Sequence, residues 1–256
     1  MKTVAIIQAR LGSSRFPGKV LQPILRKPML WHIVDRLRHV PSLDRIVVAV
    51  PSGPKDEPLQ QFCRENGIAC FAGSELDVLD RFYRAAQQFS GDPVLRVTAD
   101  CPLVDPALIQ ELIDLYQGGK YDHVGVATGA GADHLQEGRF PDGLDCECFS
   151  FAALERSWRE ATDIRDREHV TRYMWHNHHL FRCNSLMAKR PYPKFRLTVD
   201  HLDDFLLVTK IYDSLYSPNR PFLLDEVMDF LNKNPELLEI NRRVAEMSNY
   251  RAVLEN

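Results

Sequence analysis

The side chains best suited to chemistry lie in one short segment, Gln8 to Leu21, directly after the apolar run Val4 to Ile7. Its cations are Arg10, Arg15 and Lys19, its hydroxyls Ser13 and Ser14, and its glycines Gly12 and Gly18. Backbone N–H groups, hydroxyls and cations together bind polyphosphates, and glycines let an anion approach the backbone closely. The spacing is not that of a Walker A loop, because Gly12 to Gly18 is one residue too long and Val20 follows Lys19. The alternative is a solvated basic turn after an edge strand.

Two aspartates farther along the chain also follow apolar runs. Asp100 comes after Val94–Thr98, and Asp200 comes after Phe195–Val199. Carboxylates at strand ends are suited to Mg²⁺, which binds one or two protein carboxylates together with substrate phosphates. The two would meet only if their strands lie close in the sheet. Asp100 as a turn cap is the competing interpretation. Asp105 and the Asp200 rivals Asp203 and Asp204 are better explained as helix caps.

Two further stretches are candidates for contacting a second substrate. The first is Arg139 to Glu147, with Asp142, Asp145 and Glu147 as polar candidates. The second is Asp166 to Thr171, which offers Glu168 and His169 at an expected helix start. A plain loop leading into a strand and an exposed helix cap are the alternatives.

Alternating strand and helix signals position these residues. Strands are expected at 4–7, 45–50, 68–71, 94–98 and 195–199, and helices at 29–40, 59–66, 77–89, 106–116, 151–161, 169–177 and 203–215. This rhythm predicts an α/β fold, with a mainly parallel sheet in a three-layer sandwich. With no repeat or long linker, residues 1–256 are expected to form a single domain with a helical C-terminal segment from about 222 to 256.

Composition narrows the class of protein. The net charge of −3 argues against general binding to nucleic acid. None of the six cysteines forms a C-x-x-C pair, and no signal peptide or membrane-spanning run is evident, so a cytoplasmic protein without a membrane partner is expected. Cys146 and Cys148 with His169 are a zinc alternative, but C-x-C on a strand is more simply two buried thiols on one face.

The first segment resembles the N-terminal signature of the cytidylyltransferases that make CMP-ketodeoxyoctonate and CMP-sialate. That signature has the form A-R-x-x-S-x-R-x-P-G-K-x-L. The fixed places are filled here by Ala9, Arg10, Ser13, Arg15, Pro17, Gly18, Lys19 and Leu21. The Gln-Ala-Arg opening and the stretches 140–145 and 166–171 look more like the spore-coat polysaccharide (SpsF-like) branch. The resemblance covers about residues 1 to 240.

The resemblance implies a nucleotide-diphosphosugar transferase-like (Rossmann-like) fold and transfer of CMP from CTP to an acidic sugar or phosphorylated acceptor, releasing pyrophosphate. It further implies a homodimer, a role in surface polysaccharide biosynthesis, and a Mg²⁺ cofactor held by Asp100 and Asp200. Catalysis would fall to Arg10, Arg15, Lys19 and Asp100, and nucleotide binding to Ala9, Arg10, Gly12, Ser13, Ser14, Lys19, Ser74 and Thr98. Acceptor binding would fall to Arg139, Asp142, Asp145, Glu168 and His169. Ala99 stands where the family usually has glycine.

Two other functions remain open at this point. One is a glycosyltransferase that uses a nucleotide-sugar donor, although Asp100-Cys-Pro lacks the second aspartate of a D-x-D motif. The other is a regulator that binds nucleotide without catalysis, which the combination of Asp100, Asp200 and three cations makes the weaker alternative.

Overall fold

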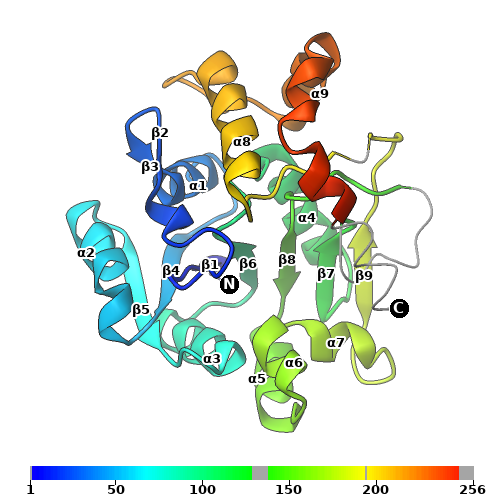
Figure 1. The fold of residues 1–256 in the computed structure, drawn as a ribbon. Coiled ribbons are helices and arrows are strands. Elements are labelled where there is room, and N and C mark those ends of the chain that lie inside the picture. The colour runs from blue at the N-terminus through cyan, green and yellow to red at the C-terminus, as the bar shows by residue number, and fades with distance from the viewer. Residues whose placement is uncertain (1, 129–137, 194, 248–256) are drawn as a thin grey trace.

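The core of the protein is a seven-stranded sheet of order β5-β4-β1-β6-β8-β7-β9 (Figure 1). The computed structural model describes residues 2–128, 138–193 and 195–247. The strands of this sheet are β1 (Val4–Gln8), β4 (Arg45–Pro51), β5 (Ala69–Gly73), β6 (Val94–Thr98), β7 (His123–Val126), β8 (Cys146–Phe149) and β9 (Cys183–Leu186). Only β8 runs against its neighbours, so the sheet is mainly parallel, as predicted. A separate antiparallel pair comprises β2 (Pro23–Ile24) and β3 (Lys27–Pro28).

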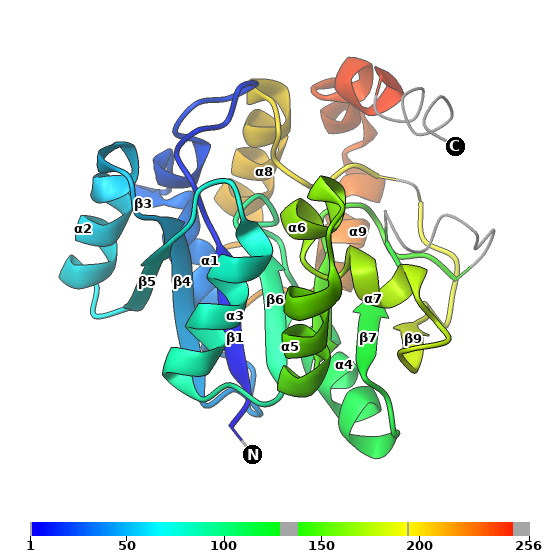
Figure 2. The same cartoon turned by 90° about the horizontal axis from the view of Figure 1, so that it is seen from below.

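Helices cover both faces of the sheet, which gives the expected three layers (Figure 2). The helices are α1 (Met29–Leu37), α2 (Glu57–Glu65), α3 (Val78–Phe89), α4 (Pro106–Gly118), α5 (Phe151–Glu160), α6 (Ile164–His169), α7 (Arg172–His176), α8 (Leu202–Leu215) and α9 (Leu224–Lys233). Short 3₁₀ turns span Lys19–Leu21, Pro54–Asp56 and Pro235–Glu239. No helix among the described residues is long and apolar enough to cross a bilayer.

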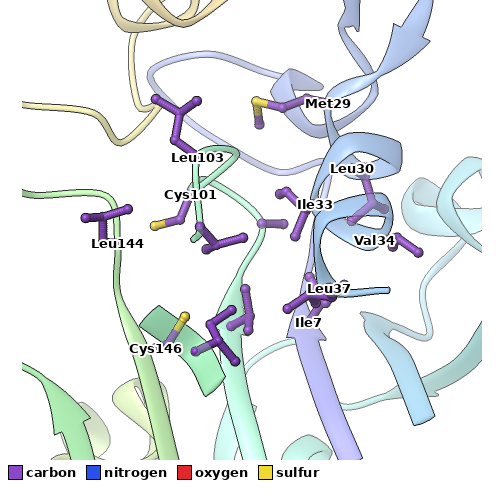
Figure 3. Close-up of a cluster of buried hydrophobic side chains, with 14 of the residues drawn as sticks. Ile7, Met29, Leu30, Ile33, Val34, Leu37, Cys101, Leu103, Leu144 and Cys146 are labelled. Carbon is purple, nitrogen blue, oxygen red and sulfur yellow. The ribbon is translucent and has the colours of Figure 1, made fainter. Parts of the chain in front are cut away.

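Alternation along β1 shows how the two cores form. Ala5 and Ile7 pack against α1 on one face, whereas Val4 and Ile6 face α3 on the other. Figure 3 shows Ile33 and Leu37 of α1 over Ile7 in the first of these cores. Strands buried on both faces need continuous apolar runs, which is why the β1, β4 and β6 sequences could be recognised.

The prediction of a strand at 195–199 was wrong. This segment is extended, but it pairs with loops rather than with a strand of the sheet. The Leu197 N–H donates to the Asp142 carbonyl (2.8 Å), and the Val199 N–H donates to the Asp100 carbonyl (2.7 Å). Leu197 and Val199 are buried and hold the segment in place. Residues 196–199 are all buried without belonging to the sheet, and Asp200 lies at the end of this segment.

The helix expected at 169–177 was confirmed only in part, because α7 covers Arg172–His176. His169 is the last residue of α6 rather than the first of a helix, and α7 begins only at Arg172. Between them Val170 is fully buried at φ +57°, a region that β-branched residues rarely adopt. Val170 is buried in the core that also contains Val4 and Ile6, and the chain turns there between the two helices.

Candidate phosphate and carboxylate site

The segment after β1 folds into a tight loop around Leu11. The Leu11 N–H donates to Asp56 Oδ1 (2.6 Å), and the Leu11 carbonyl accepts from the N–H groups of Ser13 (2.9 Å) and Gly18 (3.1 Å). Gly18 has φ +70° and caps the 3₁₀ turn that begins at Lys19. A residue without a Cβ is favoured at this angle, so Gly18 lets the loop turn Lys19 back toward the sheet.

Lys19 brings the two sequence-predicted metal ligands together. Its Nζ donates to the Val199 carbonyl (2.7 Å) and to Asp200 Oδ1 (3.0 Å), and it lies 3.4 Å from Asp100 Oδ2. Lys19 is only 8% exposed, although it lies in a loop. Asp100 and Asp200, a hundred residues apart in sequence, therefore share one ammonium group.

Asp200 receives two more cations. Arg15 lies 2.9 Å from its Oδ1, and Arg196 donates to its Oδ2 at 2.8 Å. Burial alone would raise the pKa of Asp200, but Lys19, Arg15 and Arg196 together lower this pKa to about 2. The Asp200 carboxylate thus stays ionised throughout the physiological pH range.

Asp204 holds Arg196 and the backbone of Asp200 in position. Its side chain is fully buried, accepts from Arg196 Nε (3.1 Å) and Asn241 Nδ2 (3.0 Å), and also accepts from the backbone N–H groups of Asp200 and His201 at 3.0 Å each. Asp204 is a helix cap, as expected, but it also orients Arg196 and the Asp200 backbone.

The second polar stretch places Asp142 beside the same arginine, with Asp145 held in the same loop. Arg196 Nη1 lies 3.2 Å from Asp142 Oδ2, and Asp145 accepts from the Thr128 hydroxyl and from the Gly143 N–H (3.1 Å). Burial first, and then the neighbouring Asp145, raise the pKa of Asp142 to about 7, and burial also raises that of Asp145. These two carboxyls are therefore electrostatically unlike Asp200.

Gly143 permits this close approach. At φ +102°, a Cβ on Gly143 would lie 2.4 Å from the backbone nitrogen of Thr198. Any side chain would push the Asp142–Asp145 loop away from the 195–200 segment, so the glycine keeps the two acidic loops adjacent.

The other predicted residues lie in varied places. Arg139 Nε donates to the Thr128 carbonyl (2.7 Å), beside Asp145. Ser74 Oγ accepts from the Asp77 N–H (3.0 Å), and Thr98 Oγ1 lies 3.3 Å from Cys101 Sγ. Ala9 is buried, whereas Arg10 and Ser14 are exposed, with Gly12 and Ser13 between these extremes.

Glu168 and His169 make no contact with the aspartates of the site in the described part of the chain. Both side chains are exposed on α6, and within the described ranges neither forms an ion pair or hydrogen bond with Asp100, Asp142 or Asp200. The neighbour Arg167 instead pairs with Asp77 at the start of α3. The zinc alternative fails as well, because Cys146 and Cys148 are buried in the core that packs against α1 and α4.

Sequence reasoning missed two cations beside the loop. Lys55 Nζ lies 3.0 Å from the position of a Cβ built on Gly12. Arg81 of α3 is fully buried; burial and the nearby Arg10 lower its pKa to about 10. Lys55 lies in the turn after β4, and β4 is a parallel neighbour of β1. The segments after the two strands therefore lie at the same edge of the sheet, which is the signal that could have indicated Lys55.

Glu147 was a polar candidate in the sequence, but its buried partners Arg96 and His123 were not foreseen. Arg96 of β6 donates through Nη1 to Glu147 Oε2 (2.5 Å), and His123 Nε2 lies 3.0 Å from Glu147 Oε1. Burial would raise the pKa of Glu147, but Arg96 and His123 lower it to about 2. Within the described part of the chain, Arg96 Nε and His123 Nδ1 are buried without a hydrogen-bond partner.

The oxygen atoms around Lys19 are the kind that Mg²⁺ prefers. Asp100 Oδ2, Asp200 Oδ1 and the Val199 carbonyl all converge on one point. Across the described residues, no group of three or more His, Cys, Asp or Glu side chains is arranged to hold a metal ion. The protein therefore offers two carboxylates, which suits an ion whose remaining ligands come from a substrate.

Comparison with known proteins identifies relatives of this chain. Over 257 residues, covering both chains fully, the sequence is 35% identical to an uncharacterized protein, MJ1063, of Methanocaldococcus jannaschii. It is 32% identical to the spore coat polysaccharide biosynthesis protein SpsF of Bacillus subtilis, covering 90% of this chain and 94% of SpsF. A 3-deoxy-manno-octulosonate cytidylyltransferase of Trichlorobacter lovleyi is 33% identical over 46% of each chain.

Solved structures agree with this relationship. A cytidylyltransferase from Leptospira borgpetersenii superposes with a TM-score of 0.84 and 26% identity, covering 93% of this chain and 97% of that one. The cytidylyltransferase family pattern matches residues 4–243, which include the cationic loop from Gln8 to Leu21 (the candidate phosphate loop) and both aspartates that meet at Lys19. The chain therefore belongs to the cytidylyltransferase family.

Proposed function

We propose that this protein transfers CMP from CTP to an acidic sugar or a phosphorylated acceptor and releases pyrophosphate. The observation that carries the proposal is the meeting of the phosphate loop with Asp100 and Asp200 at Lys19 Nζ. Cations for a triphosphate and carboxylates for a divalent ion are then within a few ångströms of each other, as nucleotidyl transfer requires.

In this proposal the loop binds the triphosphate of CTP. Arg10, Arg15 and Lys19 bind the β- and γ-phosphates and stabilise the charge that develops on the leaving pyrophosphate. Backbone N–H groups near Gly12 and the Ser13 and Ser14 hydroxyls add neutral donors. An acceptor oxygen then attacks the α-phosphorus in line with the leaving group, and positioning dominates the catalysis.

Asp100 and Asp200 would hold Mg²⁺ beside the α-phosphate. Their oxygen atoms and the Val199 carbonyl already point at one position, so the donor set fits a hard cation. When bound, Mg²⁺ supplies charge neutralisation at the reacting phosphate.

The acceptor would contact the acidic loop at 139–147. Asp142 contacts the same Arg196 as Asp200 does. The raised pKa of Asp142, about 7, suits a group that accepts a proton or hydrogen bond from an acceptor hydroxyl. Arg139 beside Thr128 offers a positive charge for an acidic acceptor. Acceptor contacts of Glu168 and His169 stay a prediction, as do the nucleotide contacts of Ser74 and Thr98, the homodimer, the cytoplasmic location and the spore-coat role.

Pyrophosphate release tests the proposal. Purified protein is incubated with CTP and Mg²⁺ and with a panel of acidic sugars, sugar phosphates and phosphonates, with ATP replacing CTP as a control. We expect acceptor-dependent release with CTP and much less with ATP. Release of free nucleotide from a nucleotide-sugar donor would favour a glycosyltransferase, and CTP binding without turnover on any acceptor would favour a regulator.

A further inference from the structure

The position of Lys19 suggests more than phosphate binding. Its Nζ has three oxygen contacts, to the Val199 carbonyl, Asp200 Oδ1 and Asp100 Oδ2, at 2.7 to 3.4 Å. These are the oxygens that would hold the divalent ion of the proposed function. An ammonium and a metal ion cannot both lie at the centre of the same three oxygens.

We infer that Lys19 holds the place of the divalent cation until a triphosphate withdraws it, so that the protein binds the cation well only together with a triphosphate. This inference rests on the proposed function for its metal. The Lys19 side chain is 10% exposed, so the ammonium is shielded from water and screening of its charge is weak. The cation must therefore displace a well-held lysine or wait for it to leave.

The triphosphate provides the reason for Lys19 to leave. Lys19 belongs to the phosphate loop itself, one residue after Gly18, and anions on that loop would attract the ammonium away from the carboxylates. Arg15 would follow the same course, because it is 46% exposed and contacts Asp200 from the same loop. Arg196 would stay, because Asp204 and Asp142 also hold it.

The arrangement couples two binding events through one side chain. Each ligand strengthens the other, because the cation site is freed when the phosphates take Lys19, and binding linkage makes the effect reciprocal. It also keeps the two carboxylates neutralised in the nucleotide-free protein. Without a nucleotide, the Lys19 ammonium then suppresses metal binding, although the carboxylate ligands are present.

The test uses Mn²⁺ alone as the probe, with free ion measured by electron paramagnetic resonance and no nucleotide present. Lys19→Gln should bind Mn²⁺ about 10- to 100-fold more tightly than the wild type, because a buried positive charge has been removed from the site. Lys55→Gln is the matched control. Lys55 lies beside Gly12 but forms no ion pair within the described chain. The affinity of the Lys55→Gln protein for Mn²⁺ should therefore stay within about two-fold of wild type.

Further variants make the result decisive. Lys19→Gln combined with Asp100→Asn should lose the gained affinity, which shows that the ion lies between the carboxylates. Unchanged or weaker Mn²⁺ binding in Lys19→Gln overturns the inference, and an equal gain in Lys55→Gln overturns it too, because the effect would then be general electrostatics.

The wild-type protein decides the matter if Lys19→Gln does not fold, as circular dichroism would reveal. Water-proton relaxation reports protein-bound Mn²⁺, and the signal should be small with Mn²⁺ alone and large after inorganic triphosphate is added. Equal signals in both conditions would contradict the inference. None of these measurements uses CTP or an acceptor, so a failure of the proposed CMP transfer shows up separately, as absent pyrophosphate release with the Mn²⁺ results intact.

Discussion

The two halves of the sheet carry opposite electrostatics. On the β1 side, cations from the loop at 10–19 surround Asp200 and hold its pKa near 2. On the β8 side, burial and then the neighbouring Asp145 raise the pKa of Asp142 to about 7. Arg196 contacts both Asp142 and Asp200. The contrast shows that one arginine can join a carboxylate that stays ionised to a carboxyl group whose pKa lies near neutrality.

Removing the shared carboxylates should have the largest effect on the positive side. Asp100→Ala and Asp200→Ala should each lower turnover with CTP by at least about three orders of magnitude, because each empties the same cation site. The double variant should be little worse than either single one, since the effects of one unit do not add. Initial rates of pyrophosphate release measure all three. Multiplicative losses would mean that the two aspartates serve different sites.

Asp204 should contribute far more to stability than Asp203. Asp204→Ala leaves the buried Arg196 without its fully buried partner, so unfolding free energy should fall by about 3–5 kcal/mol. Asp203 lies in the same first turn of α8, and Asp203→Ala should cost about 0.5–1 kcal/mol as a weakened helix start. Urea titrations compare the two. Equal losses would show that Arg196 does not depend on Asp204.

The roles of Lys19 and Lys55 can be distinguished by the turnover of their alanine variants. Lys19→Ala should lower turnover by about two to three orders of magnitude, the scale for losing one well-placed charge. Lys55→Ala removes a cation from the same loop cluster without touching a carboxylate and should lower turnover about ten-fold or less. Steady-state kinetics with CTP provide the comparison. Near-normal turnover of Lys19→Ala would remove the loop from the mechanism.

The raised pKa of Asp142 should make the stability of the protein depend on pH. The folded-state pKa of Asp142, about 7, lies above its ordinary value of 3.8, so the folded protein holds this proton more tightly than the unfolded chain. Asp142 therefore favours folding at low pH, and this contribution is lost as the pH rises from about 4 through 7. Asp142→Asn removes the titration. Its stability relative to wild type, from urea titrations at pH 5 and pH 8, should be more favourable at pH 8, and a pH-independent difference would contradict the raised pKa.

Sequence patterns predicted the β1 side of the fold far better than the β8 side. Strands β1, β4 and β6 lie where apolar runs indicated them, because a strand covered on both faces needs such a run. β9 (Cys183–Leu186) was missed, since a short edge strand with Asn184 and Ser185 has no such signal. The reversed direction of β8 has no local signature at all.

The candidate site divides in the same way. Residue types and spacing were enough to indicate the phosphate loop and to single out Asp100 and Asp200, because anion and metal binding demand particular side chains at strand ends and turns. The sequence could not show that Lys19 is buried against both aspartates, that Arg196 joins the two acidic loops, or that Lys55 and Arg81 flank the loop.

By itself, then, the sequence determined the chemistry on offer: a cationic loop after a buried strand, two acids after apolar segments, and an α/β rhythm to carry them. Tertiary structure alone decided which groups meet. The Lys19–Val199 contact joins residues 180 positions apart. Burial and Asp145 raise the pKa of Asp142, whereas Lys19, Arg15 and Arg196 lower that of Asp200. Such proximity depends on long-range packing, and electrostatic interactions act across space rather than along the chain.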